Sequence, residues 1–340
     1  MTERPRRFLV VRLGSMGDVI HAIPAVASLR ARHAAARIDW LVDPRYAAVP
    51  QMVRGVDQAI PIDTRGSAID LLRTIRRLRQ AGYDAAVDLQ GLIKSAVLAR
   101  AAGARRTLGF PRERLREPIA RVFYTETHDP GRDAHVISKN LGLMRALGVE
   151  DVQVTFPLNV PRTPAGDNAA AAFGPDGYAV IHPGAAWPNK RWPAERFGAV
   201  AAGIRARIGV RSLVLWGPGE ESLASLVAAA SKGCADVSPR TSIVDLFAIV
   251  RGAKLMIAGD TGPLHVAASV GTPIVGLFGP TLAERSGPYS RADIALSRTS
   301  RCSCRDERRC RLPQPCIDDI GVEEVVAAVE RRLAQWPNPQ

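Results

Sequence analysis

"RFLVVRLGSMGDVIHAIPAVASLRARH" (residues 7–33) joins a short apolar run to a longer stretch with helical periodicity. Phe8–Leu13 predicts a buried strand, and residues 18–33 place apolar side chains at helical spacing, so the glycine-bearing turn connects a strand to a helix. Asp18 then falls in the first helical turn. A carboxylate there is favoured by the helix dipole and can cap free N–H groups, or it can act as a catalytic base. Both interpretations stay open on this stretch alone.

The same alternation of strand and helix runs through the first half of the chain. Strand-like runs are expected at residues 8–13, 38–43, 57–62 and 84–89. Helical stretches lie at residues 18–33, 68–82 and 92–103. Strands separated by helices indicate βαβ units and therefore a parallel sheet.

A second alternating series follows residues 157–177, which are rich in Pro, Gly, Ala and Asp. Its strand-like runs are 178–184, 211–217, 254–260 and 272–279, with helices at 194–209 and 242–253. We therefore predict an α/β protein with two Rossmann-like, doubly wound domains that face one another across a cleft. The expected division is 1–160 for an N-terminal domain, 161–177 for a linker, 178–320 for a C-terminal domain, and 321–340 for a C-terminal helix and tail. Such domains bind ligands at the carboxyl ends of their strands.

The composition is that of an ordinary globular protein. The 340 residues are 46% apolar, 23% charged and 5% aromatic, which suffices for two cores. The apolar run near the N-terminus is too short for a secretory signal, and the longest apolar stretch, 255–280, is interrupted by Asp260, His265, prolines and glycines. The expectation is a soluble cytoplasmic protein.

The net charge of +13 is unevenly distributed. Residues 1–160 contain 25 Lys and Arg against 16 Asp and Glu, whereas residues 161–340 contain 21 against 17. Clusters at 73–79 and 105–116 concentrate the excess. They suit a polyanionic partner such as an anionic membrane surface or a phosphorylated glycolipid, although a solvated helix face explains the first cluster equally well. With few aromatic residues to stack bases, nucleic acid is the weakest candidate.

Three predicted strands of the second half end in glycine-containing turns. The residues of interest in these turns are Lys190, Glu220, Glu221, Thr261 and Gly262. Backbone N–H groups at the last of these turns would bind phosphate, Lys190 would add a positive charge, and a glutamate could accept hydrogen bonds from two ribose hydroxyls. Together the turns predict a nucleotide-diphosphate pocket. Each alone is more often structural, and His265, one turn into its helix, could be a core histidine.

Five blocks of the chain resemble the ADP-heptose–lipopolysaccharide heptosyltransferases of glycosyltransferase family 9, and they occur in the family's order almost end to end. The blocks are "RLGSMGDVIHAIPAV", "YDAAVDLQGLIKSA", "LREPIARVFY", "HPGAAWPNKRWPAERF" and "GDTGPLHVAASVGTPIVGLFGPT". The resemblance implies a GT-B fold, no cofactor, no metal requirement, and inverting transfer of heptose from ADP-L-glycero-β-D-manno-heptose to the lipopolysaccharide inner core.

The resemblance also implies roles for matching positions. Asp18 matches the catalytic base, which removes a proton from the acceptor hydroxyl as that hydroxyl attacks the anomeric carbon opposite the leaving diphosphate. Lys190 matches the lysine that neutralises the departing ADP. The other donor-binding positions are Gly14, Ser15, Ala185, Ala186, Glu220 or Glu221, Thr241, Asp260, Thr261, Gly262 and His265.

The acceptor is expected to bind the basic first domain. Lys94 and Arg116 match family positions that face the acceptor, whose Kdo carboxylates and lipid A phosphates suit arginine's planar guanidinium. Arg73, Arg76 and Arg77 are further candidates. The blocks around Lys94 and Arg116 look more like the enzymes that add the first heptose to Kdo than those that add the second, and a protein acting there would sit on the inner face of the inner membrane.

A cysteine-rich loop departs from this pattern. "CSCRDERRCRLPQPC" contains Cys302, Cys304, Cys310 and Cys316, whereas Cys234 stands alone. Four cysteines could close a tetrahedral zinc shell, but the C-x-C start is not the usual C-x-x-C spacing. A reduced or reversibly oxidised loop is the alternative in a cytoplasmic protein.

Two other functions remain open at this level. A transferase of the same fold could use a different nucleotide sugar, because side chains outside the motifs select the donor sugar. A non-catalytic binding protein could keep the same fold, although the presence of Asp18 and Lys190 argues against it.

Overall fold

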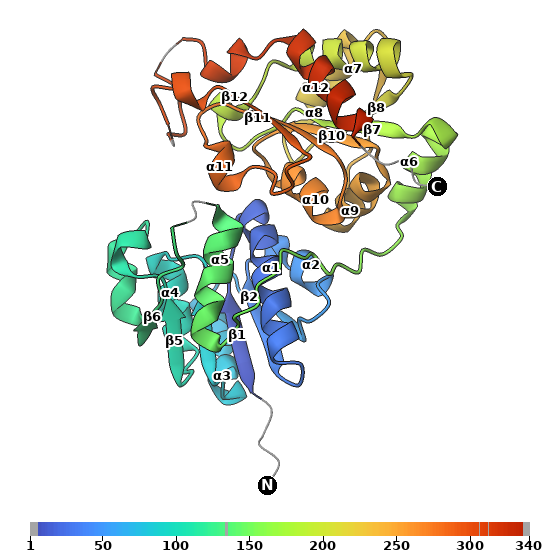
Figure 1. Ribbon diagram of the computed structural model, residues 1–340. Helices are drawn as coiled ribbons and strands as arrows, with labels where there is room; N and C mark the ends of the chain where they lie inside the picture. Colours follow the sequence, from blue (N-terminus) through green and yellow to red (C-terminus); the bar gives the residue numbers. More distant parts are fainter. Residues whose placement is uncertain (1–5, 133–134, 306, 312, 336–340) are drawn as a thin grey trace. The chain divides into compact units, whose positions relative to one another are not determined.

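The computed structural model describes residues 6–132, 135–305, 307–311 and 313–335. The chain divides into two compact units, Met1–Asn159 and Val160–Gln340. Each unit contains one six-stranded sheet covered by helices, so the α/β class with two doubly wound domains is confirmed (Figure 1). In the described residues, no helix combines the length and the apolar character needed to cross a bilayer.

The first unit contains a parallel sheet in the order β3-β2-β1-β4-β5-β6. Its strands are β1 Arg7–Val11, β2 Arg37–Val42, β3 Gln58–Pro61, β4 Ala85–Asp88, β5 Arg106–Gly109 and β6 Glu126–Thr127. Its α-helices are α1 Met16–Arg32, α2 Ala48–Gln51, α3 Ala68–Ala81, α4 Ile93–Ala101 and α5 Val136–Met144. Leu9 and Val11 of β1 pack in one core with Leu78 of α3 and Leu98 of α4, while α1 packs against α5.

The second unit repeats this topology in the order β12-β11-β10-β7-β8-β9. Its strands are β7 Tyr178–His182, β8 Arg211–Val214, β9 Ala235–Val237, β10 Leu255–Gly259, β11 Ile274–Phe278 and β12 Ile294–Ser297. Its α-helices are α6 Pro164–Phe173, α7 Ala194–Ile208, α8 Glu221–Ala230, α9 Ile243–Gly252, α10 Gly262–Val270, α11 Ala283–Ser286 and α12 Val322–Ala334. Helices α7, α8 and α12 share one core with β7, and Figure 1 shows α9 and α10 on the other side of the sheet.

Each sheet has one point where the order of strands reverses. In the first sheet β1 lies between β2 and β4, and in the second β7 lies between β8 and β10. The loops after the two central strands diverge to opposite faces at such a point, which leaves room for a ligand beyond the carboxyl ends. The functional residues of each unit are therefore expected after β1 and β4, and after β7 and β10.

The stretch 161–177, expected as a linker, contains helix α6. Thr163 caps this helix by accepting a hydrogen bond from Gly166 N–H at 3.1 Å, and Pro164 occupies its first turn, where proline is tolerated. Helix α6 packs against α9. The alanine run that suggested a linker is therefore part of the second unit. At the other end, α12 forms the expected C-terminal helix, and residues 336–340 of the expected tail lie outside the described residues.

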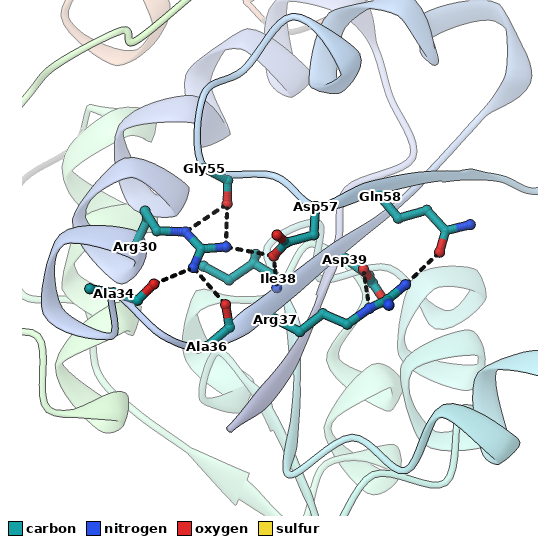
Figure 2. A network of polar contacts seen from close by, with 9 residues as sticks. All are labelled: Arg30, Ala34, Ala36, Arg37, Ile38, Asp39, Gly55, Asp57 and Gln58. Atoms are coloured by element: carbon teal, nitrogen blue, oxygen red, sulfur yellow. Dashed lines mark hydrogen bonds and ion pairs between the residues drawn. The ribbon is translucent and has the colours of Figure 1, made fainter. Parts of the chain in front are cut away.

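Part of the first unit's positive charge is used inside the fold. Figure 2 shows the guanidinium of Arg30, near the end of α1, donating to the Gly55 carbonyl at 3.1 and 3.0 Å and to Asp57 at 2.5 Å. Asp57 also accepts from the Ile38 N–H at 2.7 Å, and Arg37 pairs with Asp39 at 3.0 Å. This network ties α1 to the amino end of β2, opposite the edge where ligands bind, so these arginines stabilise the fold.

Candidate active site

Asp18 lies just beyond the carboxyl end of β1, in the first turn of α1. Its Oδ2 accepts hydrogen bonds from both the N–H and the hydroxyl of Ser15, each at 3.0 Å. The helix thus gains the capped first turn that the sequence predicts for a carboxylate at this position. The side chain remains 38% exposed, so capping leaves the carboxylate accessible to a second partner.

Arg12 is a functional candidate that the sequence analysis missed. Its side chain is 8% exposed, and Nη2 pairs with Asp18 Oδ1 at 2.5 Å. Nη1 donates to the carbonyl of Leu89, which follows β4, so Arg12 spans the point where the strand order reverses. The sequence does contain a signal for Arg12, since it is an arginine within an apolar strand run. A charged side chain is rarely buried without a partner, so this position predicts an ion pair or hydrogen bonds.

The surroundings of Asp18 favour its ionised form. Burial opposes ionisation, but Arg12, His21 and the two hydrogen bonds from Ser15 outweigh it and hold the pKa of Asp18 below its usual value. An ionised carboxylate with an exposed edge can accept a proton from a bound hydroxyl. His21 is a second residue that the motif analysis did not single out.

The loop after β4 is built around the fully buried carboxylate of Asp88. The hydroxyls of Ser95 and Tyr124 donate to it at 2.8 and 2.7 Å, and the N–H groups of Gln90 and Gly91 donate at 2.8 and 3.2 Å. Burial raises the pKa of Asp88, while these hydrogen bonds oppose the shift. The motif around Lys94 therefore serves first to fix the start of α4.

The two expected acceptor residues lie on adjoining segments. The Ile93 N–H donates to Glu117 Oε2 at 2.7 Å, so the residues beside Lys94 and Arg116 are in contact. Both side chains are exposed, and Lys94 Nζ donates to Thr64 at 3.1 Å. The exposed candidates Arg73, Arg76 and Arg77 lie on α3, which packs against α4.

In the second unit, three motif residues converge on Asp260 at the end of β10. Lys190 Nζ pairs with Asp260 Oδ2 at 2.6 Å and lies 4.5 Å from the centre of the Trp187 ring. Thr281 donates to the same carboxylate at 2.7 Å, and His265 Nε2 lies 3.4 Å from Oδ1. Burial opposes ionisation of Asp260, but His265 and Lys190 outweigh it and lower its pKa. The sequence motifs contain these residues, but they do not reveal that Lys190, Thr281 and His265 contact Asp260.

The N-terminus of α10 lies next to this cluster. Thr261 is the N-cap residue, and Gly262 begins the helix. The Thr261 Oγ1 is buried and has no hydrogen-bond partner in the described part of the chain. Free backbone N–H groups and a hydroxyl at a helix N-terminus can bind phosphate. Lys190, which pairs with the preceding residue Asp260, could add a positive charge there.

The turns after β7 and β8 meet through Glu220. Its Oε2 accepts from the Gly217 N–H at 3.0 Å and lies 3.6 Å from His182 Nε2. A Cβ added at Gly184 would clash with this carboxylate, so a larger residue there would force the Glu220 side chain to move. Burial lowers the pKa of His182 although Glu220 opposes the shift, so the surroundings favour the neutral imidazole. His182 is a site residue that the sequence analysis missed, although it ends the strand before a Pro-Gly turn.

The remaining expected donor residues occupy the turns around these clusters. Glu221, unlike Glu220, is exposed at the start of α8. Ala185 is buried and its carbonyl accepts from Arg191 at 2.8 Å, whereas Ala186 is exposed.

Thr241 precedes the N-cap of α9. Gly14 approaches Tyr46 so closely that an added Cβ would lie 2.8 Å from its ring.

Comparisons with known proteins concern the family and the fold of the chain. The family model described as glycosyltransferase family 9 (heptosyltransferase) matches residues 71–315. Lipopolysaccharide heptosyltransferase 1 of Pseudomonas aeruginosa is 30% identical over 92% of this chain and 89% of its own length. The Escherichia coli K12 protein of the same name is 29% identical over 94% of this chain and 98% of its own length.

A solved structure extends the likeness to the fold. Escherichia coli heptosyltransferase WaaC with ADP matches at a TM-score of 0.76 and 26% identity, over 96% of this chain and 99% of that chain. The same enzyme with ADP-2-deoxy-2-fluoro heptose matches at 0.73 and 25%, over 95% and 99%. Two doubly wound domains in one chain with this likeness define a GT-B fold.

Proposed function

The chain belongs to glycosyltransferase family 9, the heptosyltransferases, and on that premise we propose that it transfers heptose from ADP-L-glycero-β-D-manno-heptose to the Kdo of the lipopolysaccharide inner core. The observation that carries the proposal is the phosphate-binding arrangement at the end of β10, where Lys190 stands beside the N-terminus of α10. The relatives named above support the choice of donor and acceptor.

In the proposed reaction, Asp18 accepts the proton of the acceptor hydroxyl while that oxygen forms a bond to the anomeric carbon. The bond from this carbon to the diphosphate breaks on the opposite face, so the configuration inverts and ADP leaves with the electron pair. Lys190 offsets the negative charge that develops on the departing diphosphate. Asp260 orients Lys190, because its carboxylate holds the ammonium group at 2.6 Å.

The donor would be bound by the second unit. We place the diphosphate at Thr261 and Gly262 and the ribose hydroxyls on Glu220, whose carboxylate lies within the turns after β7 and β8. Thr241 would contact the adenine. The positions Ala185, Ala186 and His265 of the same unit would complete the donor site.

The acceptor would be bound by the first unit, through Lys94, Arg116 and the arginines of α3. Four exposed apolar side chains lie on α3 and the turn 118–123, with exposed fractions of 61–72%: Ile69, Leu72, Ile119 and Val122. Exposed apolar side chains among arginines suit an anionic bilayer surface. We therefore propose that the protein works in the cytoplasm, on the inner face of the inner membrane.

Addition of the first heptose is the reaction that we propose, because the relatives at 29–30% identity are named heptosyltransferase 1. Addition of the second heptose is the alternative. Purified protein should be assayed with ADP-heptose, UDP- and GDP-sugars, and with Kdo-lipid A and heptosylated acceptors. Turnover only with ADP-heptose and Kdo-lipid A is the expected result. Turnover of another nucleotide sugar, or of the heptosylated acceptor alone, would contradict the proposal.

Glu220→Gln is expected to weaken ADP binding, whereas Glu221→Gln should leave it nearly unchanged. Hydrogen bonds to a charged group contribute roughly 1.5–3 kcal/mol, so the dissociation constant should rise by about tenfold or more in the first variant. Titration calorimetry with ADP measures both. The reverse order of effects would move the ribose contact to Glu221.

Arg116→Gln is expected to raise the acceptor KM and to flatten its dependence on salt, with ADP-heptose affinity unchanged. The Arg116 side chain is exposed, and exposed ion pairs are screened as the Debye length falls towards about 3 Å at molar salt. Steady-state kinetics at several salt concentrations tests this. Arg211→Gln, at a partly exposed arginine of the second unit that pairs with Asp236 at 2.8 Å, is the control. A variant that weakens the donor and spares the acceptor would overturn the division between the units.

A further inference from the structure

The four cysteines between β12 and α12 come together in space. Cys302 Sγ lies 3.6 Å from Cys304 Sγ, which lies 3.2 Å from Cys310 Sγ. Cys316 lies near the other three cysteines, because their thiols contribute to the raised pKa of its own thiol, of which burial is the main cause. None of the four forms a disulfide. Four thiols spread over fifteen positions of the sequence thus share one small volume.

The loop that carries them is otherwise weakly structured. Between β12 and α12 the described residues contain only two short 3-10 turns, Thr299–Arg301 and Cys316–Asp319. Long connections without secondary structure are usually functional, or they are linkers or disordered segments. Cys304 is 1% exposed and the other three cysteines are partly buried, so the loop folds around the thiol of Cys304.

The spacing and the charges fit a bound cation. In a tetrahedral site with zinc–sulfur bonds of about 2.3 Å, neighbouring sulfurs lie about 3.8 Å apart. The described residues contain no three ligating side chains already arranged around a metal position, but the Cys302–Cys304 and Cys304–Cys310 sulfur distances of 3.6 and 3.2 Å lie close to that spacing. A zinc ion with four thiolates has a net charge of −2. Arg301, Arg305, Arg308, Arg309 and Arg311 stand in the same segment and offset it.

We propose that Cys302, Cys304, Cys310 and Cys316 bind one zinc ion, and that this site supports the wall of the donor pocket. On binding, each thiol loses its proton to solvent and zinc keeps its oxidation state. The site is closed by four protein ligands, so its role is structural.

The support reaches Lys190 through two contacts. Asn189 Nδ2 donates to the carbonyl of Glu307, which lies between the second and third cysteines, at 2.9 Å. Thr299 Oγ1 donates to the carbonyl of Thr281 at 2.8 Å, and the Thr281 hydroxyl donates to Asp260. Loss of the metal would therefore loosen the residues on both sides of the Lys190–Asp260 pair. The supporting role of the zinc site for the donor pocket rests on the proposed function.

Metal content of the purified full chain tests the site without any assay of transfer. Elemental analysis should find about one zinc per chain in the wild type and in Cys234→Ser, whose cysteine stands outside the cluster. Cys304→Ser should lose most of the metal. If Cys304→Ser does not fold, cobalt substitution of the wild type provides a second readout, because tetrahedral cobalt thiolates absorb strongly in the visible range.

Several outcomes would overturn the site: wild-type protein without metal, iron in place of zinc, a disulfide among the four cysteines, or equal zinc in Cys304→Ser. For the supporting role, displacement of zinc by a mercurial should lower the Tm and raise the donor KM several-fold while the acceptor KM stays constant. If zinc is present but its displacement changes neither the donor KM nor the Tm, the zinc site stands and its supporting role is contradicted. If the protein turns over no ADP-heptose at all, the proposed function fails while the metal analysis still stands.

Discussion

Asp18→Asn should lower kcat by about a hundredfold or more and leave the dissociation constant of ADP nearly unchanged, since loss of a general base typically costs about 10²–10⁴-fold. Asparagine has the same shape and can still accept from the Ser15 N–H, so the capped turn of α1 persists. Only the capacity to take the acceptor's proton is lost. Steady-state kinetics and ADP calorimetry separate the two quantities, and turnover near that of the wild type would remove Asp18 from the reaction.

The pH dependence of turnover provides a second test of the same carboxylate. A base works only when ionised, and the pKa of Asp18 is held low, so activity should persist as the pH falls until that lowered pKa is reached. Arg12→Gln removes the 2.5 Å ion pair and should raise the pKa of Asp18, which moves the acidic limb of the profile to higher pH. If Arg12 only supported the fold, the limb would stay in place.

Sequence pattern identified the strands that carry the sites but not all strands of the sheets. The runs that became β1, β4, β7 and β10 are apolar and buried, so their own pattern reveals them. Strands β5, β6, β9 and β12 were missed, because their two to four residues do not lie in a longer apolar run as those of β4 do, and they are strands only through pairing with a neighbour. Helix α6 was also missed, because the Pro-, Gly- and Ala-rich composition of this stretch is typical of a linker. The structure shows that Thr163 caps it.

The motifs gave the residues of the candidate site without their partners. Lys190 and Asp260 are 70 positions apart, and they meet because β7 lies beside β10 in the sheet. That neighbourhood follows from the order of strands, which periodicity within single segments does not reveal. Arg12 was missed for the same reason, since its contact with Leu89 depends on β1 lying beside β4.

Lys190→Ala is expected to reduce both ADP-heptose affinity and kcat, with about 10²–10³-fold lost from kcat if Lys190 offsets charge on the leaving diphosphate. The Lys190 and Asp260 side chains are 15% and 8% exposed, so removal of the lysine leaves a buried carboxylate with less compensation. Breaking such a pair costs about 3–5 kcal/mol when it is fully buried, and Thr281 and His265 reduce that cost here.

The double variant Lys190→Ala/Asp260→Asn separates stability from catalysis. It removes the unpaired charge, so its Tm should recover towards that of the wild type while its turnover stays low. Lys254→Ala is the matched control, because this exposed lysine lies at the amino end of β10 whereas Asp260 lies beyond its carboxyl end. Turnover that recovers together with Tm in the double variant would reduce Lys190 to a structural partner of Asp260. Low turnover in a stable protein would instead support a direct contact between this ammonium group and the departing ADP.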